Sequence, residues 1–113
     1  MKMLKLEFEM PKGLFLSPDE EKKTPVQLAK DTIKNVILAL GMSVKGFKED
    51  ERRLYYKICD KLEAKNEDGS EKAEIEFEDQ EFGFIKRAFR DGGLMPNPLL
   101  RKIEDCIAAT PDR

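Results

Sequence analysis

Apolar and polar residues alternate along the first ten positions of the chain. The apolar positions of this alternation are Leu4, Leu6, Phe8 and Met10. Because successive side chains of a strand point to opposite faces, the period of two predicts a strand at residues 3 to 10 with one buried face. The motif PKG then predicts a turn, and the apolar run at residues 14 to 16 is long enough to return as a short second strand.

A second alternation lies at residues 73 to 78. Glu74, Glu76 and Glu78 are separated by Ile75 and Phe77, which predicts another half-buried strand whose acidic side chains face water. Each of the two strands has one apolar face to bury. We therefore expect the strand at residues 73 to 78 to lie next to the N-terminal strand.

The clearest helix follows Thr24. Thr24 offers a side-chain oxygen at the N-cap, Pro25 suits the first helical position, and Gln27 completes a capping box. Apolar residues then recur at spacings of three and four as far as Leu40. Gly41 follows as a residue that can turn left-handed, so we expect this helix to end near Leu40.

Three further helices are predicted from the same spacing. The second covers residues 48 to 65. The third is capped by Asp79 and ends before Gly92, and the fourth starts after Asn97 and stops before Thr110. The connecting stretch DGGLMPNPLL lacks a preceding strand and carries neither GxxxxGK nor GxGxxG, so it predicts a corner rather than a phosphate-binding loop.

Together these elements predict an α+β fold in which about four helices pack on a small β-sheet. A chain of 113 residues is long enough for one compact domain, here spanning residues 1 to 113. Within it we expect a loop at 17–23, a turn at 66–72 and a frayed tail at 110–113.

The composition predicts a globular protein with a densely charged surface. Charged residues make up 39% of the chain and hydrophobic residues 40%, while the net charge is only −2. Neither nucleic acid nor an anionic membrane would attract such a chain through its bulk field. Nothing resembles a signal peptide or a membrane span, and Cys59 and Cys106 lie in apolar helical patterns, which favours buried thiols in a reducing cytosol.

The sequence contains no motif that is typical of a cofactor site or a metal site. The chain contains no histidine and no CxxC motif, so structural zinc and the commonest general base are not expected. The acidic turn NEDGSEKAEIE fails as a calcium loop, because placing Gly69 at its sixth position puts Ala64 and Ile75 where oxygen ligands are required. Paired carboxylates would need a cleft that the sequence does not indicate.

Two charged surfaces are candidate binding sites. Basic residues of the second helix and of the corner could follow a phosphate backbone or contact a protein: Arg53, Lys57, Lys61, Arg87, Arg90, Arg101 and Lys102. Acids on the same helix explain much of this charge as surface pairing. Glu74, Glu76 and Glu78 form a candidate acidic surface for a partner.

From residue 51 onward four segments follow one another in a recognisable order: ERRLYYKICDKLEA, AEIEFED, EFGFIKRAF and LMPNPLLRKIEDCI. This order of helix, acidic strand, helix and proline-containing turn with a last helix resembles a family of small proteins encoded in bacteriophage and prophage genomes. MLKLEF and TPVQLAKDTI echo the family's N-terminal part more loosely. The resemblance implies a phage or prophage accessory protein in the bacterial cytoplasm, and it brings no site residues.

We therefore expect a non-enzymatic interaction protein that binds a host protein or a phage protein, or that self-associates. The alternative is a nucleic-acid-binding accessory protein that uses the basic residues named above. An enzyme ranks third, because neither the residues nor the resemblance provides a reaction.

Overall fold

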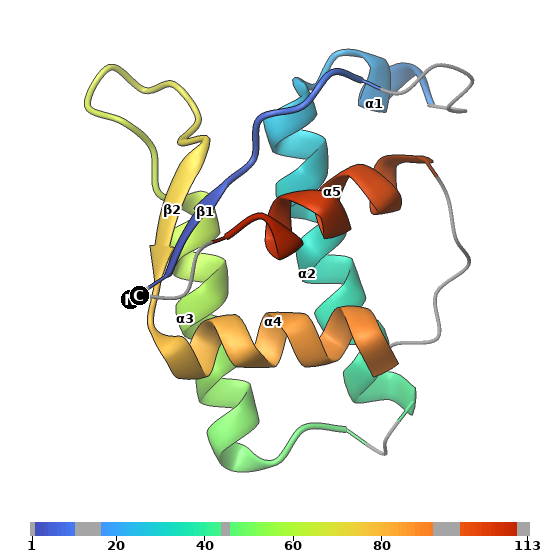
Figure 1. Cartoon of the computed structure of the whole chain (residues 1–113), viewed down its shortest axis with the longest axis vertical. Helices are drawn as coiled ribbons and strands as arrows, with labels where there is room; N and C mark the ends of the chain where they lie inside the picture. Colours follow the sequence, from blue (N-terminus) through green and yellow to red (C-terminus); the bar gives the residue numbers. More distant parts are fainter. Residues whose placement is uncertain (1, 11–16, 44–45, 92–97, 111–113) are drawn as a thin grey trace.

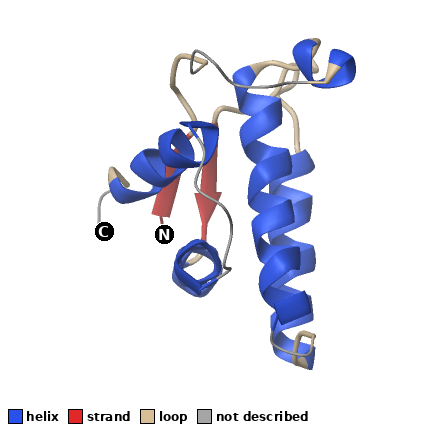
Figure 2. Ribbon diagram, turned by 90° about the vertical axis from the view of Figure 1, so that its right-hand side faces the viewer, coloured by secondary structure: helices blue, strands red, loops and turns tan. Residues whose placement is uncertain are grey.

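The structure, a computed structural model, describes residues 2–10, 17–43, 46–91 and 98–110. These residues form one α+β globule, with a two-stranded antiparallel sheet and helices arranged in three layers (Figures 1 and 2). In Figure 2, α2 (Pro25–Ser43) and α3 (Glu49–Glu63), which contact each other, overlap on one side of the sheet, and α5 (Pro98–Ala108) lies on the other. The fourth helix, α4 (Asp79–Asp91), runs across α2 and α3 and contacts both (Figure 1). The predicted fold class is confirmed.

The sheet pairs two segments that lie far apart in the sequence. β1 (Lys2–Lys5) and β2 (Glu74–Phe77) are antiparallel, with Leu4 opposite Ile75. The predicted pairing is confirmed, but β1 ends earlier than the strand expected at residues 3 to 10. Beyond Lys5 the ladder continues with one bond, from the amide of Leu6 to the carbonyl of Ala73, because the chain before β2 belongs to a turn.

The core lies between the sheet and the helices. Leu4, Ile75 and Phe77 point from the sheet into this core, and Phe77 is fully buried. The helices contribute apolar side chains at the predicted spacings of three and four, among them Ile33, Val36, Ile37, Ile58, Leu62, Ile85, Ala88 and Ile103. On the opposite face of the sheet the acidic residues of β2 remain exposed, as the alternation predicts.

The capping box that opens α2 is confirmed, whereas the predicted end of this helix is wrong. The Thr24 amide donates to Gln27 Oε1 at 3.0 Å, and the Gln27 amide donates to Thr24 Oγ1 at 3.3 Å. Gly41 lies inside the helix, where a Cβ would meet the ring of Phe47 at 2.6 Å. The left-handed residue is Gly46, with φ of 90°, so Gly41 serves packing and Gly46 serves the turn.

The structure corrects two other local predictions. The segment at 17–23, expected to be a loop, contains the single helical turn α1 (Pro18–Glu21), which Ser17 and Glu20 cap reciprocally. Asp79 is the first helical residue of α4 rather than its cap, because the carbonyl of Glu78 already accepts from Phe82.

The polar turn before β2 forms as predicted. Gly69 has φ of 84°, and its amide donates to the carbonyl of Asn66. Ser70 donates to Asp68 through both its amide and its hydroxyl. The run expected to return as a strand at 14–16, the glycines and cap of the corner at 92–97, and the tail from 111 onward lie outside the described residues.

Candidate functional site

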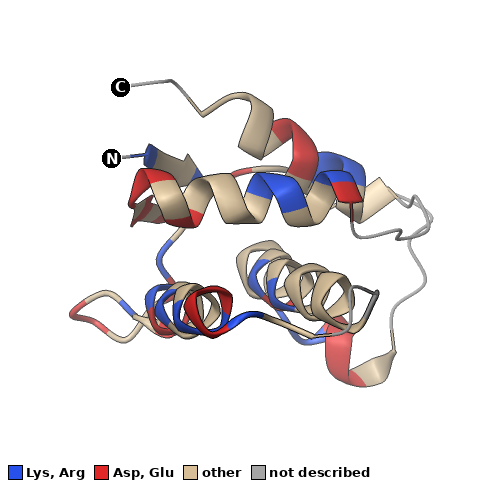
Figure 3. Ribbon diagram, turned by 90° about the horizontal axis from the view of Figure 1, so that it is seen from below, with Lys and Arg blue, Asp and Glu red and all other residues tan. Residues whose placement is uncertain are grey.

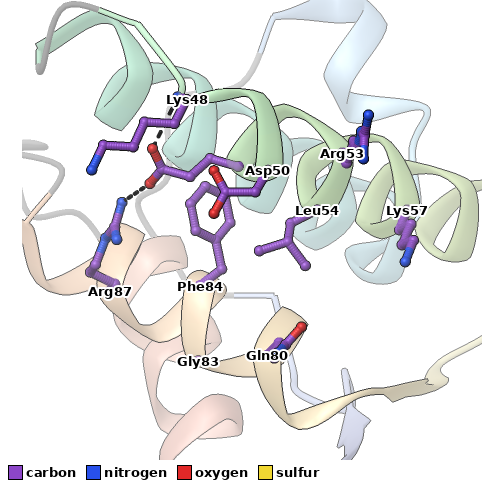
Figure 4. Close-up of a pocket in the computed structure, with 10 residues that line it drawn as sticks. Lys48, Asp50, Arg53, Leu54, Lys57, Gln80, Gly83, Phe84 and Arg87 are labelled. Atoms are coloured by element: carbon purple, nitrogen blue, oxygen red, sulfur yellow. Dashed lines mark hydrogen bonds and ion pairs between the residues drawn. The ribbon is translucent and has the colours of Figure 1, made fainter.

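A groove of about 530 Å³ runs between α3 and α4. Leu54 from α3 and Phe84 from α4 lie in the space between the two helices, where Gly83 adds no side chain (Figure 4). Phe84 is 5% exposed and also packs edge-on against Phe47, which fixes its ring. The half-buried Leu54 and the small exposed part of Phe84 therefore give the groove a limited apolar floor, which the core holds in place.

Charged side chains line the walls of this groove. Four bases and two acids line it: Lys48, Arg53, Lys57, Arg87, Asp50 and Glu51. Arg53, Lys57 and Arg87 were predicted as candidate binding residues, and the fold brings these three together although 34 positions separate the first from the last. Figure 3 shows the basic residues of α4 gathered toward its C-terminal half, which complements the helix dipole.

An ion pair between Arg87 on α4 and Glu51 on α3 joins the two helices at one end of the groove. Arg87 donates to Glu51 Oε2, and the Lys48 amide donates to Glu51 Oε1 at 3.1 Å (Figure 4). The guanidinium of Arg87 also lies 5.3 Å from the centre of the Phe84 ring. These hydrogen bonds, with that of Arg87 the stronger, lower the pKa of Glu51 below its ordinary value. Because Glu51 stays ionised near neutral pH, it pairs with Arg87 and does not exchange protons there.

This lowered pKa predicts a pH-dependent contribution to stability. A carboxylate whose folded pKa lies below its unfolded value stabilises the fold above the unfolded pKa, here near 4.5, and the contribution disappears as the pH falls through the folded pKa. The variant Glu51→Gln should therefore unfold at a lower urea concentration than the wild type at neutral pH. The gap between their midpoints should close as the solution is acidified below pH 4.5. A gap that stays constant from neutral to acidic pH would contradict this assignment.

The other predicted basic residues do not join the groove. Lys61 turns inward, where its ammonium pairs with Glu81 Oε1 and lies 5.9 Å from the centre of the Phe77 ring. Arg90 pairs with the adjacent Asp91 at 3.1 Å. Arg101 and Lys102 are exposed on α5 and do not line the groove. The seven predicted bases thus form no continuous track among the described residues.

The predicted acidic surface is an exposed strand face. Glu74, Glu76 and Glu78 are all exposed, and Glu74 lies 3.9 Å from Lys5 on the neighbouring strand. The amide of Glu78 donates to Glu81 Oε1 at 2.8 Å, at the start of α4. These three acids do not line the α3–α4 groove. They keep the strand face solvated, and Glu74 also lines a hollow of about 520 Å³ together with Glu7 and Cys106.

A smaller hollow of about 320 Å³ lies between α2 and α3, and acids engage three of the four lysines that line it. Its ion pairs join Lys23 to Asp31, Lys30 to Glu71 and Lys34 to Glu63, at 2.7 to 2.9 Å. Lys30 is 4% exposed, and its hydrogen bond lowers the pKa of Glu71. In the described part of the chain no group of three or more Cys, Asp or Glu side chains is placed to hold a metal ion.

The cysteines differ from their prediction. Cys59 and Cys106 are free thiols that are half-buried rather than fully enclosed. Desolvation raises the pKa of both thiols above the ordinary value. Tyr55, one turn before Cys59 on α3, is also desolvated, which raises its pKa to about 12. These groups stay protonated near neutral pH, so they offer no activated nucleophile.

Sequence reasoning did not single out several groove residues. Gly83 and Phe84 lie within the helical pattern EFGFIKRAF, and Lys48 precedes α3. The sequence feature that points to the groove is Gly83, because a glycine in the middle of a predicted helix is not explained by a turn or a cap. The residues that face Gly83 across the groove are set by the packing of α4 against α3, which the sequence pattern does not contain.

No protein-family model, characterised protein or solved structure was found to match this chain. The described helices include none that is both long enough and apolar enough to cross a membrane.

Proposed function

We propose that this protein is a non-enzymatic accessory protein that acts by binding another protein through the α3–α4 groove. The observation that carries the proposal is the groove itself, because it combines a limited apolar floor with walls that carry four bases and two acids. Protein-binding surfaces commonly have this composition, with an apolar centre and a polar rim. The order of segments from residue 51 onward supports a phage or prophage origin and hence work in the bacterial cytoplasm, with a host or phage protein as the partner.

Three features support a role in binding rather than in catalysis. In the groove the carboxylate of Glu51 is engaged by Arg87, outside it the half-buried thiols carry raised pKa values, and the chain has no histidine. A general base or nucleophile in the groove would need a pKa matched to proton transfer near neutral pH.

The proposal is tested by capturing partners from a bacterial host lysate with the tagged protein and with a charge-reversed groove. In the variant Lys57→Glu one base of the α3 wall becomes an acid. The matched control is Lys22→Glu, which makes the same charge change at an exposed position after α1. We expect a discrete protein that survives nuclease treatment, that binds the wild type and the control equally, and that binds Lys57→Glu about tenfold more weakly, which corresponds to about 1.4 kcal/mol. Equal capture by all three proteins would refute the use of this groove.

Nucleic-acid binding is the second candidate function. The observation in its favour is that Arg53, Lys57 and Arg87 meet in one groove. Against it, Lys61 and Arg90 are occupied by acids and the bases of α5 do not line the groove. A labelled DNA duplex should then bind with an affinity that falls steeply between about 50 and 200 mM salt, since each neutralised phosphate adds about −0.9 to the logarithmic slope. A weak, salt-insensitive signal would remove this candidate.

A further inference from the structure

Gly83 has no structural explanation among the described residues. It occupies the middle of α4, where glycine is less favourable than every residue except proline. Its φ does not fall in the left-handed region, and no described atom beyond its chain neighbours and its own helix backbone lies within 4 Å of the position that a Cβ would occupy. Gly41, the other glycine inside a long helix, differs because the Phe47 ring fills the space beside it. Packing therefore explains Gly41, whereas Gly83 leaves open a space that the fold itself does not use.

That open space lies on the wall of the α3–α4 groove. Gly83 lines it next to Phe84 and across from Leu54. A missing side chain allows another backbone to approach closely, which is a recurrent reason for a glycine at a binding surface.

The charges around this space favour an acidic occupant. Arg87 is engaged by Glu51, and Arg53 shares its charge with Glu49 through an exposed pair of the kind that contributes little. Lys57 makes no ion pair with a described residue. Bases outnumber acids on the groove walls, so carboxylates of a partner would find complementary charge beside an apolar floor.

We propose that the α3–α4 groove binds an acidic amphipathic helix of a partner protein, with the partner backbone lying against Gly83. This inference rests on the proposed function and specifies its partner. The apolar face of such a helix would cover Leu54 and the small part of Phe84 that remains exposed, and its acidic flank would face Lys57 and Arg53, in the helix-in-groove mode of recognition. A phosphate backbone fits less well, because it offers nothing apolar to cover the floor.

The test begins with peptide selection against the full-length protein. A library of random peptides of about 14 residues, roughly four helical turns, is displayed on yeast cells and sorted for binding. We expect the selected peptides to be acidic, with apolar residues at spacings of three, four and seven. Selected peptides that are basic or lack this spacing, or a library that yields no binder, would overturn the proposal.

The selected peptide is then titrated against three variants of the protein. Gly83→Ala should bind at least about tenfold more weakly, which would correspond to about 1.4 kcal/mol, although its melting temperature should rise by about 2–5 °C because alanine favours the helix. Lys57→Glu should weaken binding to a similar extent, and Lys22→Glu should leave it unchanged. Undiminished binding to Gly83→Ala, or tighter binding of a DNA duplex than of the peptide, would also overturn the proposal.

Failure of this inference is distinguishable from failure of the proposed function. If a captured protein depends on Lys57 but binds Gly83→Ala normally and is not displaced by the acidic peptide, the groove binds a protein of another kind. If capture does not depend on Lys57 at all, the groove is not the binding site and both proposals fail.

Discussion

Replacing Phe77 with alanine should remove about 3–5 kcal/mol from the free energy of unfolding. Phe77 is fully buried and is the largest such side chain in the described core. It fills the space between β2 and the helices, and Lys61 covers one face of its ring. Truncation would leave a cavity and remove the apolar surface under that ammonium. Urea unfolding followed by circular dichroism measures the loss.

A loss of this size is a large part of the roughly 5–15 kcal/mol that stabilises a natural domain. The conservative variant Phe77→Leu keeps most of the volume and should cost less than half as much. Tyr56→Ala is the matched aromatic control, because Tyr56 is 61% exposed, and it should change stability by at most about 0.5 kcal/mol. A cost below about 1 kcal/mol for Phe77→Ala would show that β2 does not pack on the core as described.

Replacing Lys61 with methionine should cost about 3 kcal/mol, because it strands a buried carboxylate. Glu81 is fully buried, and its Oε1 accepts from Lys61 and from the Glu78 amide. Its Oε2 is already buried without a hydrogen-bond partner among the described residues. Lys61 thus supplies the charge that makes burial of Glu81 tolerable.

The double variant Lys61→Met with Glu81→Met should recover most of this loss, since it removes both buried charges together. We expect it to remain about 1 kcal/mol below the wild type, because α4 loses the side chain that accepts from the Glu78 amide. Arg53→Met, which breaks an exposed pair on the same helix, is the control and should cost at most about 0.5 kcal/mol. Equal losses in the single and double variants would contradict the pairing.

Much of this fold is predictable because its signals are local. The alternations around Leu4 and Ile75 locate both strands, and each strand has one apolar face that is stable only when covered. The capping box of Thr24 and Gln27 locates the start of α2, since its partners are three residues apart. Prediction fails at Gly41, where the deciding partner is Phe47, a contact that local propensity does not contain.

The groove was only partly predictable for a related reason. Arg53, Lys57 and Lys61 recur every four residues and read as one basic stripe, but Lys61 turns toward Glu81, which lies 20 positions further on. Arg87 meets Arg53 and Lys57 because α4 packs across α3. Periodicity indicates which face of a helix is apolar, yet it does not indicate which charged neighbour from another helix will pair with a given base.

The pairing of β1 with β2 constrains the order of events while the ribosome makes this protein. Leu4 meets Ile75, so the first strand must wait for about 70 more residues before its partner exists. At roughly 5–20 residues per second this wait lasts several seconds. The helical pair α2 and α3 is synthesised within that interval, so it can dock first and offer a surface on which the strands later join. Until then, β1 lacks the partner strand with which it forms the sheet.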